Sequence, residues 1–332
     1  MGNVIASSIP PLSDHQSSSS SNSSNNPYIP PTALPDDLLA SFDSKKSLNN
    51  PGTIEELHRK CKDVFPVPFD GVKAIINKML SNHFQISHNI AMNSASNGYR
   101  FGATYIGTKQ ISQSEAYPLF FGEIDPSGNL NSRIIHLVGD RTKVNLMAQF
   151  QNSKCVVQQL NADYFGPDYT ASIALGNVDP VRNSGLMIAS YLQNITNKFS
   201  IGTELVIQHS PEVSYSVLAL VGRYTSPDNY IVSGNLSNHS VQMCFYRKTN
   251  QFSQVGVQLE TNLAELDSSA SFGYQIDLPK SNFVFRGFLD TNWNVGGVFE
   301  KKLLPLPLTL MFSGLINHVK SQTRVGLGLF VG

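Results

Sequence analysis

Acidic side chains recur at the polar positions of alternating segments in the C-terminal three quarters of the chain, and their chemistry is electrostatic. If the apolar members of each segment face outward, the carboxylates share the inner face of one closed sheet. Opposed carboxylates in a confined, water-filled space focus the electrostatic potential and attract cations. The candidate residues are Asp163, Glu204, Glu260, Asp277, Asp290 and Glu300.

Scattered charge is an equally open interpretation of these carboxylates. Arg286 and Lys302 fall on the same predicted inner face. Lys and Arg slightly outnumber Asp and Glu over residues 70–332, so net charge gives no preference for cations. Only local clustering of the acids would create one.

No motif for covalent chemistry accompanies these acids. The sequence holds no G-x-S-x-G, H-E-x-x-H or Walker pattern, and Gly326-Leu327-Gly328 lacks the third glycine of a dinucleotide-binding turn. The eight histidines show no metal-ligand spacing. Three cysteines, far apart and odd in number, suit a reducing compartment and argue against a disulfide framework. We therefore expect neither an enzyme nor a cofactor.

Composition narrows the class further. Only 14% of the residues are charged, against about 25% in typical soluble domains. The 24 basic and 24 acidic residues balance, which argues against a nucleic-acid binder. No Lys or Arg precedes Lys45, so neither a secretory signal nor a basic presequence is expected. The longest uncharged apolar run, 303–316, is broken by two prolines and is shorter than the about 20 residues of a membrane-spanning helix.

The composition divides the chain into three parts. Residues 1–50 form a Ser/Asn/Pro-rich tail with little apolar surface, which predicts disorder. Residues 51–69 hold a predicted amphipathic helix over 54–65, with Thr53 and Glu56 as a capping box and prolines 66 and 68 ending it. From residue 70 to 332 the hydrophobic period changes to two.

Alternation over residues 70–332 predicts an all-β protein. Apolar Tyr169, Ala171 and Ile173 alternate with small or polar neighbours, and about 19 such segments follow one another, separated by short turns. Strands of roughly 9–11 residues with apolar-out, polar-in alternation are typical of a transmembrane β-barrel. A soluble all-β ligand-binding protein also alternates, but its polar face is usually rich in Lys and Glu, whereas Ser, Asn, Gln, Thr and Gly prevail here.

Several longer motifs carry a family resemblance, which covers the chain from about residue 50 to its end. The motifs are NPGTIEELHRKCK (50–62), GVKAIINKMLSNHFQISH (71–88), FGATYIGTKQ (101–110), FGYQIDLPK (272–280) and DTNWNVGGVFEKKLLPLPL (290–308). They resemble the pore-forming subunit of the translocase of the mitochondrial outer membrane, in the eukaryotic porin superfamily.

This resemblance implies a barrel of 19 strands, with the first and last strands parallel and the short N-terminal helix in the lumen. It implies an integral protein of the mitochondrial outer membrane that passes unfolded, presequence-bearing precursor polypeptides. The implied partners are those precursors, single-span receptor and small tail-anchored subunits, membrane lipid and a second copy of the chain, with no nucleic acid. A passive metabolite porin of the voltage-dependent anion channel type is the alternative.

Two polar residues fall on the predicted outer face. Lys78 shares its face with Val72, Ala74 and Ile76, and His88 falls on the outer face of the next segment. A lysine facing lipid costs roughly 2–4 kcal/mol at mid-depth and about 0–1 kcal/mol near the interface. Either Lys78 reaches the headgroups from a strand end, or Lys78 and His88 contact an accessory subunit or a second barrel.

The last segment carries one more pattern. Arg324, Gly326, Leu329 and Val331 resemble the C-terminal sorting signal of eukaryotic outer-membrane barrels, in which a polar residue and a glycine precede alternating hydrophobic residues. A regular final strand with its apolar side chains in lipid gives the same pattern, so the two interpretations are compatible.

Overall fold

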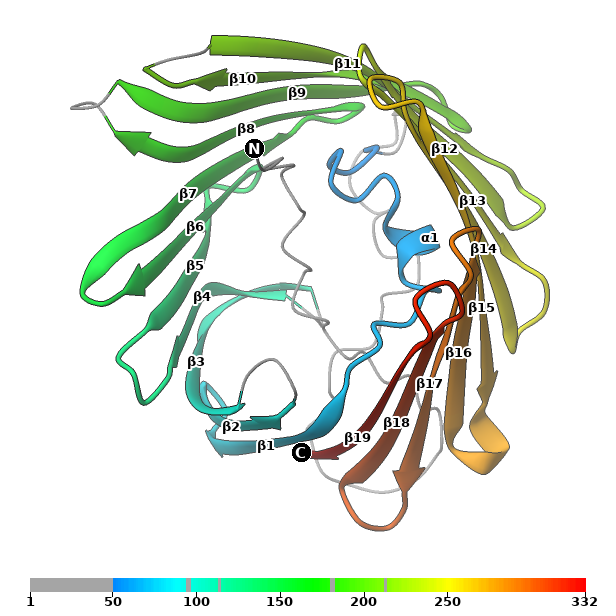
Figure 1. Cartoon of the computed structure of the whole chain (residues 1–332). Coiled ribbons are helices and arrows are strands. Elements are labelled where there is room, and N and C mark those ends of the chain that lie inside the picture. Colours follow the sequence, from blue (N-terminus) through cyan, green and yellow to red (C-terminus); the bar gives the residue numbers. More distant parts are fainter. Residues whose placement is uncertain (1–49, 94–96, 113–114, 180–182, 212–213) are drawn as a thin grey trace.

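The computed structural model describes residues 50–93, 97–112, 115–179, 183–211 and 214–332 (Figure 1). The predicted tail therefore lies outside the described residues, except for Asn50. The helical elements are α1 (Arg59–Lys62) and the 3₁₀ turn η2 (Pro279–Ser281). The strands are β1 (Gly71–Ser81), β2 (Phe84–Met92), β3 (Asn97–Ser112), β4 (Glu115–Ile124), β5 (Leu130–Val138), β6 (Thr142–Gln151), β7 (Lys154–Phe165), β8 (Tyr169–Asp179), β9 (Ser184–Thr196), β10 (Phe199–His209), β11 (Ser214–Thr225), β12 (Tyr230–Ser237), β13 (Ser240–Lys248), β14 (Ser253–Asn262), β15 (Asp267–Leu278), β16 (Phe283–Asp290), β17 (Asn294–Leu303), β18 (Leu308–Asn317) and β19 (Gln322–Val331).

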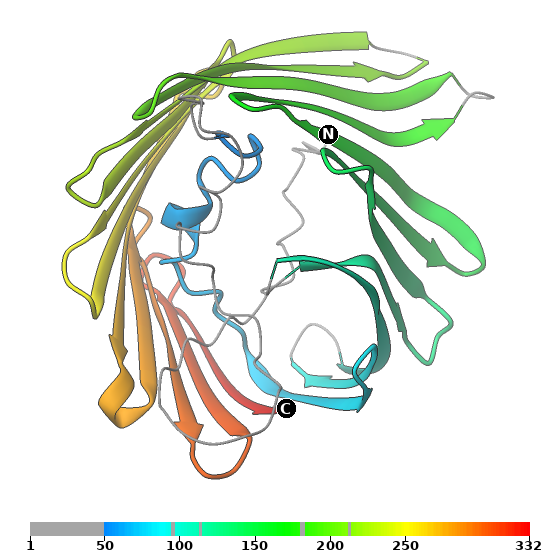
Figure 2. The ribbon, with the colours of Figure 1, turned by 180° about the vertical axis from the view of Figure 1, so that it is seen from behind.

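The described residues form one closed sheet of 19 strands, which confirms the predicted barrel (Figures 1 and 2). Each strand pairs antiparallel with its neighbours in sequence. The exception is the seam, where β1 and β19 run parallel from Gly71 opposite Gly326 to Ile76 opposite Val331. Closure pairs the backbone groups of both terminal strands, which would otherwise be unsatisfied in lipid.

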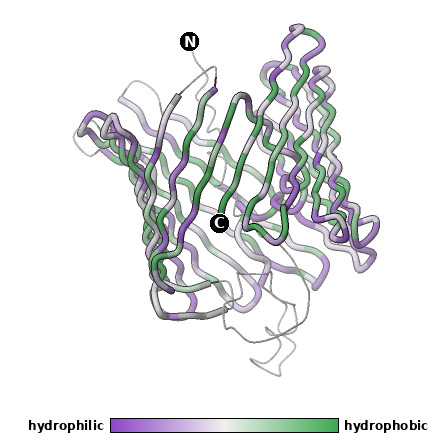
Figure 3. The backbone as a smooth tube through the Cα atoms, turned by 90° about the horizontal axis from the view of Figure 1, so that it is seen from below, coloured by the Kyte–Doolittle hydropathy of each residue, from purple (hydrophilic) through white to green (hydrophobic). Residues whose placement is uncertain are grey.

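The two faces of the sheet are assigned by the segment 50–69, which lies inside the barrel (Figures 1 and 2). Wall residues in contact with this segment, such as Ser233 and Ser313, must face the lumen. Side chains along a strand point alternately to the two faces of the sheet, and residues paired across neighbouring strands point to the same face. These contacts therefore establish which side chains face the lumen all around the barrel. Figure 3 shows the resulting alternation of hydrophobic and hydrophilic residues along the strands.

The outer face is apolar. Leu218, Met243 and Phe312 are 59%, 54% and 47% exposed, and all have outward parity. Aromatic rings pair on this face near the turns that follow odd-numbered strands, as in Tyr164 with Tyr169 and Tyr224 with Tyr230. Aromatic girdles of this kind mark the depth of the lipid headgroups in membrane barrels. We call this edge of the barrel the C-terminal rim, since β19 ends there, and the other edge the opposite rim.

The lumenal segment (residues 50–69) crosses the barrel from one rim to the other. It begins at the C-terminal rim, where Asn50 contacts the turn after β7, and it ends at the opposite rim, where Gly71 starts β1. None of the helices among the described residues is long and apolar enough to span a membrane.

The predicted helix over 54–65 is correct in place but wrong in length. Regular α-helix covers only Arg59–Lys62, and the flanking residues form turns closed by shorter i→i−3 hydrogen bonds, such as Glu56 N–H to Thr53 O at 3.1 Å. No side-chain cap holds the N-terminus of α1. Leu57, Cys61 and Val64 are nevertheless buried, as the helical spacing predicts. Contacts with the wall, rather than helix propensity, determine the conformation here.

Glycines allow the chain to pass from the lumen into the wall. Gly71 has φ +72° and lies so close to the Met92 carbonyl that a Cβ atom would overlap it. Across the seam, a Cβ on Gly326 would overlap the carbonyl oxygen of Phe69. Only glycine fits both positions without displacing backbone.

We expect Gly326→Ala to destabilise the folded barrel even when it is refolded without cellular machinery. The added methyl group meets a backbone oxygen that cannot rotate away, and overpacking of this kind costs about 1–3 kcal/mol. Urea unfolding in lipid micelles measures the difference in the free energy of unfolding. Gly314→Ala is the control, since a Cβ there has no neighbour within 4 Å. Equal stabilities of the two variants would contradict the assignment.

Candidate functional site

The lumenal segment is attached at the C-terminal rim by polar contacts. The Asn50 amide donates to Gly166 O at 2.7 Å and accepts from the Thr170 hydroxyl at 3.0 Å. Next to it, an Arg223 guanidinium nitrogen donates to Pro51 O at 2.7 Å. These bonds hold the start of the described chain against β8 and β11.

Apolar and polar contacts alternate farther along the segment. Leu57 packs against Leu192 and Val221, and all three side chains are at most 3% exposed. His58 Nδ1 lies 2.8 Å from the Ser233 hydroxyl. Burial lowers the pKa of His58 to about 4, so its imidazole is neutral at pH 7 and adds no positive charge to the lumen.

The remainder of the segment follows β13, β14, β15, β18 and β19. The α1 residue Cys61 contacts β13 and β14, and the Phe65 ring lies where a side chain on Gly273 would stand. Phe69 N–H donates to the Ser313 hydroxyl at 2.9 Å. The segment therefore lines the β8–β19 half of the lumen, while the described part of the β1–β7 half faces it across the barrel (Figure 1).

The register places all six predicted carboxylates on the lumenal face, since each pairs across the sheet with a residue of inward parity. Three stand near the C-terminal rim, one in the middle of its strand and two near the opposite rim. In that order they are Asp163, Asp277 and Glu300, then Glu204, then Glu260 and Asp290. Their proposed role in binding cations stays a prediction.

Two of these acids converge on a third that the sequence analysis did not single out. Glu55, on the lumenal segment, interacts electrostatically with both Asp163 of β7 and Glu204 of β10. Burial, followed by repulsion from Asp163, raises the pKa of Glu55 above its usual value, while the nearby bases Arg133 and Lys143 act in the opposite direction. We call Glu55, Asp163 and Glu204 the acidic cluster. A positive charge bound between these side chains would relieve their mutual repulsion.

Two other predicted acids form hydrogen bonds or an ion pair with residues of the wall. Glu300 forms an ion pair with Arg286 at 2.8 Å, and both side chains are mostly buried. Glu260 accepts hydrogen bonds from the amides of Gln242 and Gln258. Arg286 thus balances the charge of Glu300, whereas two amides hold the Glu260 side chain in a fixed orientation.

The inner wall also carries an apolar patch that the alternation of the sequence does not predict. Leu119 and Phe121 of β4 pair with Ile135 and Arg133 of β5, and this register turns the two β4 side chains and Ile135 toward the lumen. We call Leu119, Phe121 and Ile135 the lumenal apolar patch. On β4 and β5 both faces carry apolar residues, so the rule that the apolar set faces lipid does not identify the inner face.

Strand β4 also carries a further lumenal acid that the alternation does not predict. Glu123 of β4 is 9% exposed and accepts a hydrogen bond from the Asn89 side chain at 2.8 Å. It has the parity of Leu119 and Phe121, and inspection of the alternation alone would assign this set to lipid. Only the strand register reveals it.

Lys78 and His88 lie on the outer face, as their parity predicts. His88 pairs with Ile76 across the sheet, and its ring contacts Tyr99 and Phe101. Lys78 is three residues from the end of β1, near the C-terminal rim, beyond the last residue of β1 that pairs with β19. This position suits both a headgroup contact and a contact with another protein.

The residues of the predicted sorting signal divide between the two faces of β19. Leu329 and Val331 face lipid opposite Ala74 and Ile76 across the seam. Arg324 and Gly326 have inward parity, opposite Leu315 and Ser313 of β18. The close contact with Phe69 therefore explains why position 326 is a glycine, in addition to any role in sorting.

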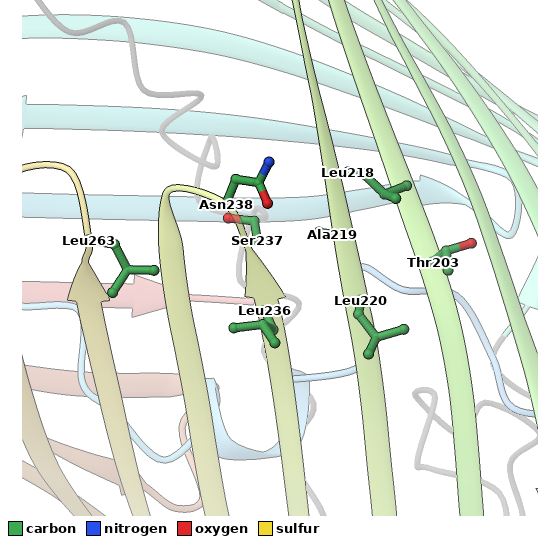
Figure 4. A pocket seen from close by; sticks show the side chains of 8 residues that line it. All are labelled: Thr203, Leu218, Ala219, Leu220, Leu236, Ser237, Asn238 and Leu263. Atoms are coloured by element: carbon green, nitrogen blue, oxygen red, sulfur yellow. The ribbon is translucent and has the colours of Figure 1, made fainter.

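A hollow of about 490 Å³ lies on the outside of the barrel, near the turn between β12 and β13 (Figure 4). Its lining includes the exposed, outward-facing Leu218, Leu220 and Leu236. Such a surface faces acyl chains, so it is not part of the lumenal passage.

A closed sheet with an apolar exterior and a polar lumen that carries its own N-terminal segment defines a β-barrel membrane channel. The eukaryotic porin family matches residues 50–326.

Among relatives, the chain is similar to "Mitochondrial import receptor subunit TOM40 homolog 2" of Drosophila melanogaster, with 43% identity over 100% of both chains. The TOM40 homologue of Xenopus tropicalis shows 43% identity over 100% of both chains, and that of Homo sapiens 44% over 86% of this chain and 79% of the human one. The chain belongs to the eukaryotic porin family, in its group of TOM40 import receptor subunits.

We expect Leu57→Ala to release the lumenal segment from the wall. Removing a buried leucine side chain costs about 2–5 kcal/mol, which is large compared with the hydrogen bonds that hold this segment. Backbone amides of residues 54–65 should then exchange with deuterium much faster in vesicle-reconstituted protein. Val67→Ala is the control, since Val67 is 73% exposed. Unchanged exchange in the Leu57 variant would show that the polar contacts alone fix the segment.

Proposed function

We propose that this chain is the protein-conducting channel of the mitochondrial outer membrane and passes unfolded, presequence-bearing precursor polypeptides. The observation that carries the proposal is the acidic cluster on a lumen wall that also bears the lumenal apolar patch. Asp163 of the cluster lies on β7, two strands from Ile135 of the patch. The names of the TOM40 relatives, which are mitochondrial import receptor subunits, support the same function.

Passage of a precursor polypeptide through the lumen requires no covalent chemistry. A presequence that folds as a basic amphipathic helix presents positive charge on one side and apolar side chains on the other. Carboxylates attract the first and the apolar patch receives the second, and neither contact needs catalysis. Exposed ion pairs contribute only about 0.2–1 kcal/mol each, so such a chain is held weakly enough to move on.

A passive metabolite porin is the second candidate, because the same fold serves both. The relatives favour import, since those at 43–44% identity carry the import receptor name. Conductance of the refolded protein in a planar bilayer separates the two functions. Block by a basic presequence peptide, absent with a scrambled peptide of equal charge, supports import, and anion preference with no block supports the porin.

We expect Asp163→Asn combined with Glu204→Gln to weaken block of the channel by a presequence peptide. Two carboxylates together supply about 1–2 kcal/mol, so the concentration for half-maximal block should rise roughly 5- to 30-fold. Glu265→Gln, in the turn between β14 and β15, is the control for a general change of charge. If both variants shift block equally, the acidic cluster is not a binding site.

We propose that the outer face around Lys78 and His88 contacts a partner within the membrane, either a helical subunit or a second barrel. The partners proposed for the assembly are single-span receptor and small tail-anchored subunits. A polar pair beside the β1–β19 seam is costly in lipid and gains hydrogen bonds in a protein interface.

Lys78→Ala with His88→Ala should shift the native assembly to a smaller size on native gels of solubilised membranes. Lys301→Ala is the matched control, since Lys301 is an outward lysine of β17, away from the seam. An unchanged assembly in the double variant would contradict the contact and leave Lys78 as a headgroup contact.

We propose that Arg324, Gly326, Leu329 and Val331 also act in sorting. Leu329→Ala should slow insertion of the chain into isolated mitochondria, measured as resistance to carbonate extraction. The control is Leu310→Ala, since Leu310 lies directly opposite Leu329 on β18 and also faces lipid. This variant loses an equivalent leucine side chain at a position outside the signal. Equal insertion of the two variants would refute the signal.

A further inference from the structure

Two thiols far apart in the sequence meet where α1 touches the wall. Cys61 Sγ lies 3.5 Å from the carbonyl oxygens of both Phe245 on β13 and Val257 on β14. Phe245 follows Cys244, whose side chain has lumenal parity, and Cys244 pairs across the sheet with Gln258, the neighbour of Val257. Cys61 therefore lies against the part of the wall that carries Cys244.

The two side chains interact and are enclosed. The Cys61 and Cys244 thiols affect each other's ionisation, and these residues are 3% and 1% exposed. The wall opposite Cys61 has no side chain at Gly256, where a Cβ would lie 3.2 Å from Cys61 O and 3.3 Å from Cys61 Sγ. Glycine at this position lets α1 approach the sheet closely enough for the thiols to meet.

We propose that Cys61 and Cys244 are an oxidisable pair, whose disulfide ties the lumenal segment covalently to β13. The pair does not depend on what passes through the lumen, so the inference goes beyond the proposed function. Its reduced form is the one present in the structure, where all three cysteines are free.

The oxidant fitting this site is a small disulfide such as glutathione disulfide. Local opening of the segment exposes the Cys61 thiol, which loses its proton and attacks one sulfur of the oxidant, releasing one glutathione thiolate. The Cys244 thiol then loses its proton, displaces the second glutathione and leaves the Cys61–Cys244 disulfide. Two thiols are oxidised and one glutathione disulfide is reduced to two glutathione molecules, so the exchange balances and reduced glutathione reverses it.

The order of attack follows from the two environments. Cys61 lies on a four-residue helix held by side-chain contacts, so it opens more readily than Cys244 in the paired strand. The neighbouring Cys244 thiol has the largest effect on the Cys61 thiol and lowers its pKa, whereas burial acts in the opposite direction. A lower pKa raises the thiolate fraction, which is the attacking species.

The test uses the full chain reconstituted in phospholipid vesicles and treated with glutathione disulfide. After free thiols are alkylated, digestion with chymotrypsin and mass spectrometry identify the state of each cysteine. We expect joint loss of the free thiols of Cys61 and Cys244, a linked peptide that contains both, and its disappearance on reduction with dithiothreitol. Cys155, exposed at the start of β7, serves as the internal measure of oxidation and should carry glutathione.

Three outcomes would overturn the proposal. Cys61 and Cys244 could stay reduced when Cys155 is fully modified, both could accumulate glutathione instead of joining, or Cys61 could link to Cys155. Cys244→Ser is the control variant and should give no linked peptide. The wild-type result stands without it if that variant fails to fold.

A second measurement tests the tether itself. In a Cys155→Ser background, oxidation should slow deuterium exchange of backbone amides in residues 54–65, and dithiothreitol should restore the original rate. Adding Cys244→Ser should abolish the change. Equal exchange before and after the disulfide has formed would show that the bond does not restrain the segment.

Discussion

Closure of the sheet is the constraint on which the rest of this structure depends. In hydrocarbon an unpaired N–H or C=O group costs several kcal/mol, so the first and last strands must pair with each other. The parallel seam from Gly71–Gly326 to Ile76–Val331 meets this need, and it determines where the chain enters the wall. β1 begins at the rim opposite the one where Asn50 is held, so the residues between them run from one rim of the lumen to the other.

Once the sheet is closed, each side chain has only two environments, lipid or lumen. The lumenal segment occupies one half of the interior and is seated by small wall residues, with Gly256 and Gly273 under α1 and Phe65, and Gly326 beside Phe69. The other half keeps its larger inward side chains, among them Phe121 and Ile135. Among the described residues, this asymmetry gives the passage two different walls, one formed by the lumenal segment and the other by the side chains of the sheet.

Much of this arrangement could be predicted from the sequence, because alternation with a period of two reports which face of a strand meets lipid. The six inward carboxylates and the outward Lys78 and His88 all follow from it. The rule failed on β4, where apolar residues occupy both faces and Phe121 and Glu123 could be placed only by the register with β3 and β5. The helix was predicted too long because local spacing cannot anticipate contacts with β11–β14. For the same reason, no local pattern could join Cys61 to Cys244, which meet only through the closed sheet.

Under the proposed function, the distribution of carboxylates along the lumen allows a basic chain to pass by a series of weak contacts. The acidic cluster extends from Asp163 near the C-terminal rim to Glu204 midway along its strand, and Glu260 and Asp290 stand near the opposite rim. A single deep acidic site would retain a basic chain, because it would have to lose all of its binding energy before moving. Several shallow sites in series let the chain exchange one contact for the next, the general condition for conduction. The Glu300–Arg286 ion pair has the same consequence under this proposal, because it balances the charge of one acid near the C-terminal rim.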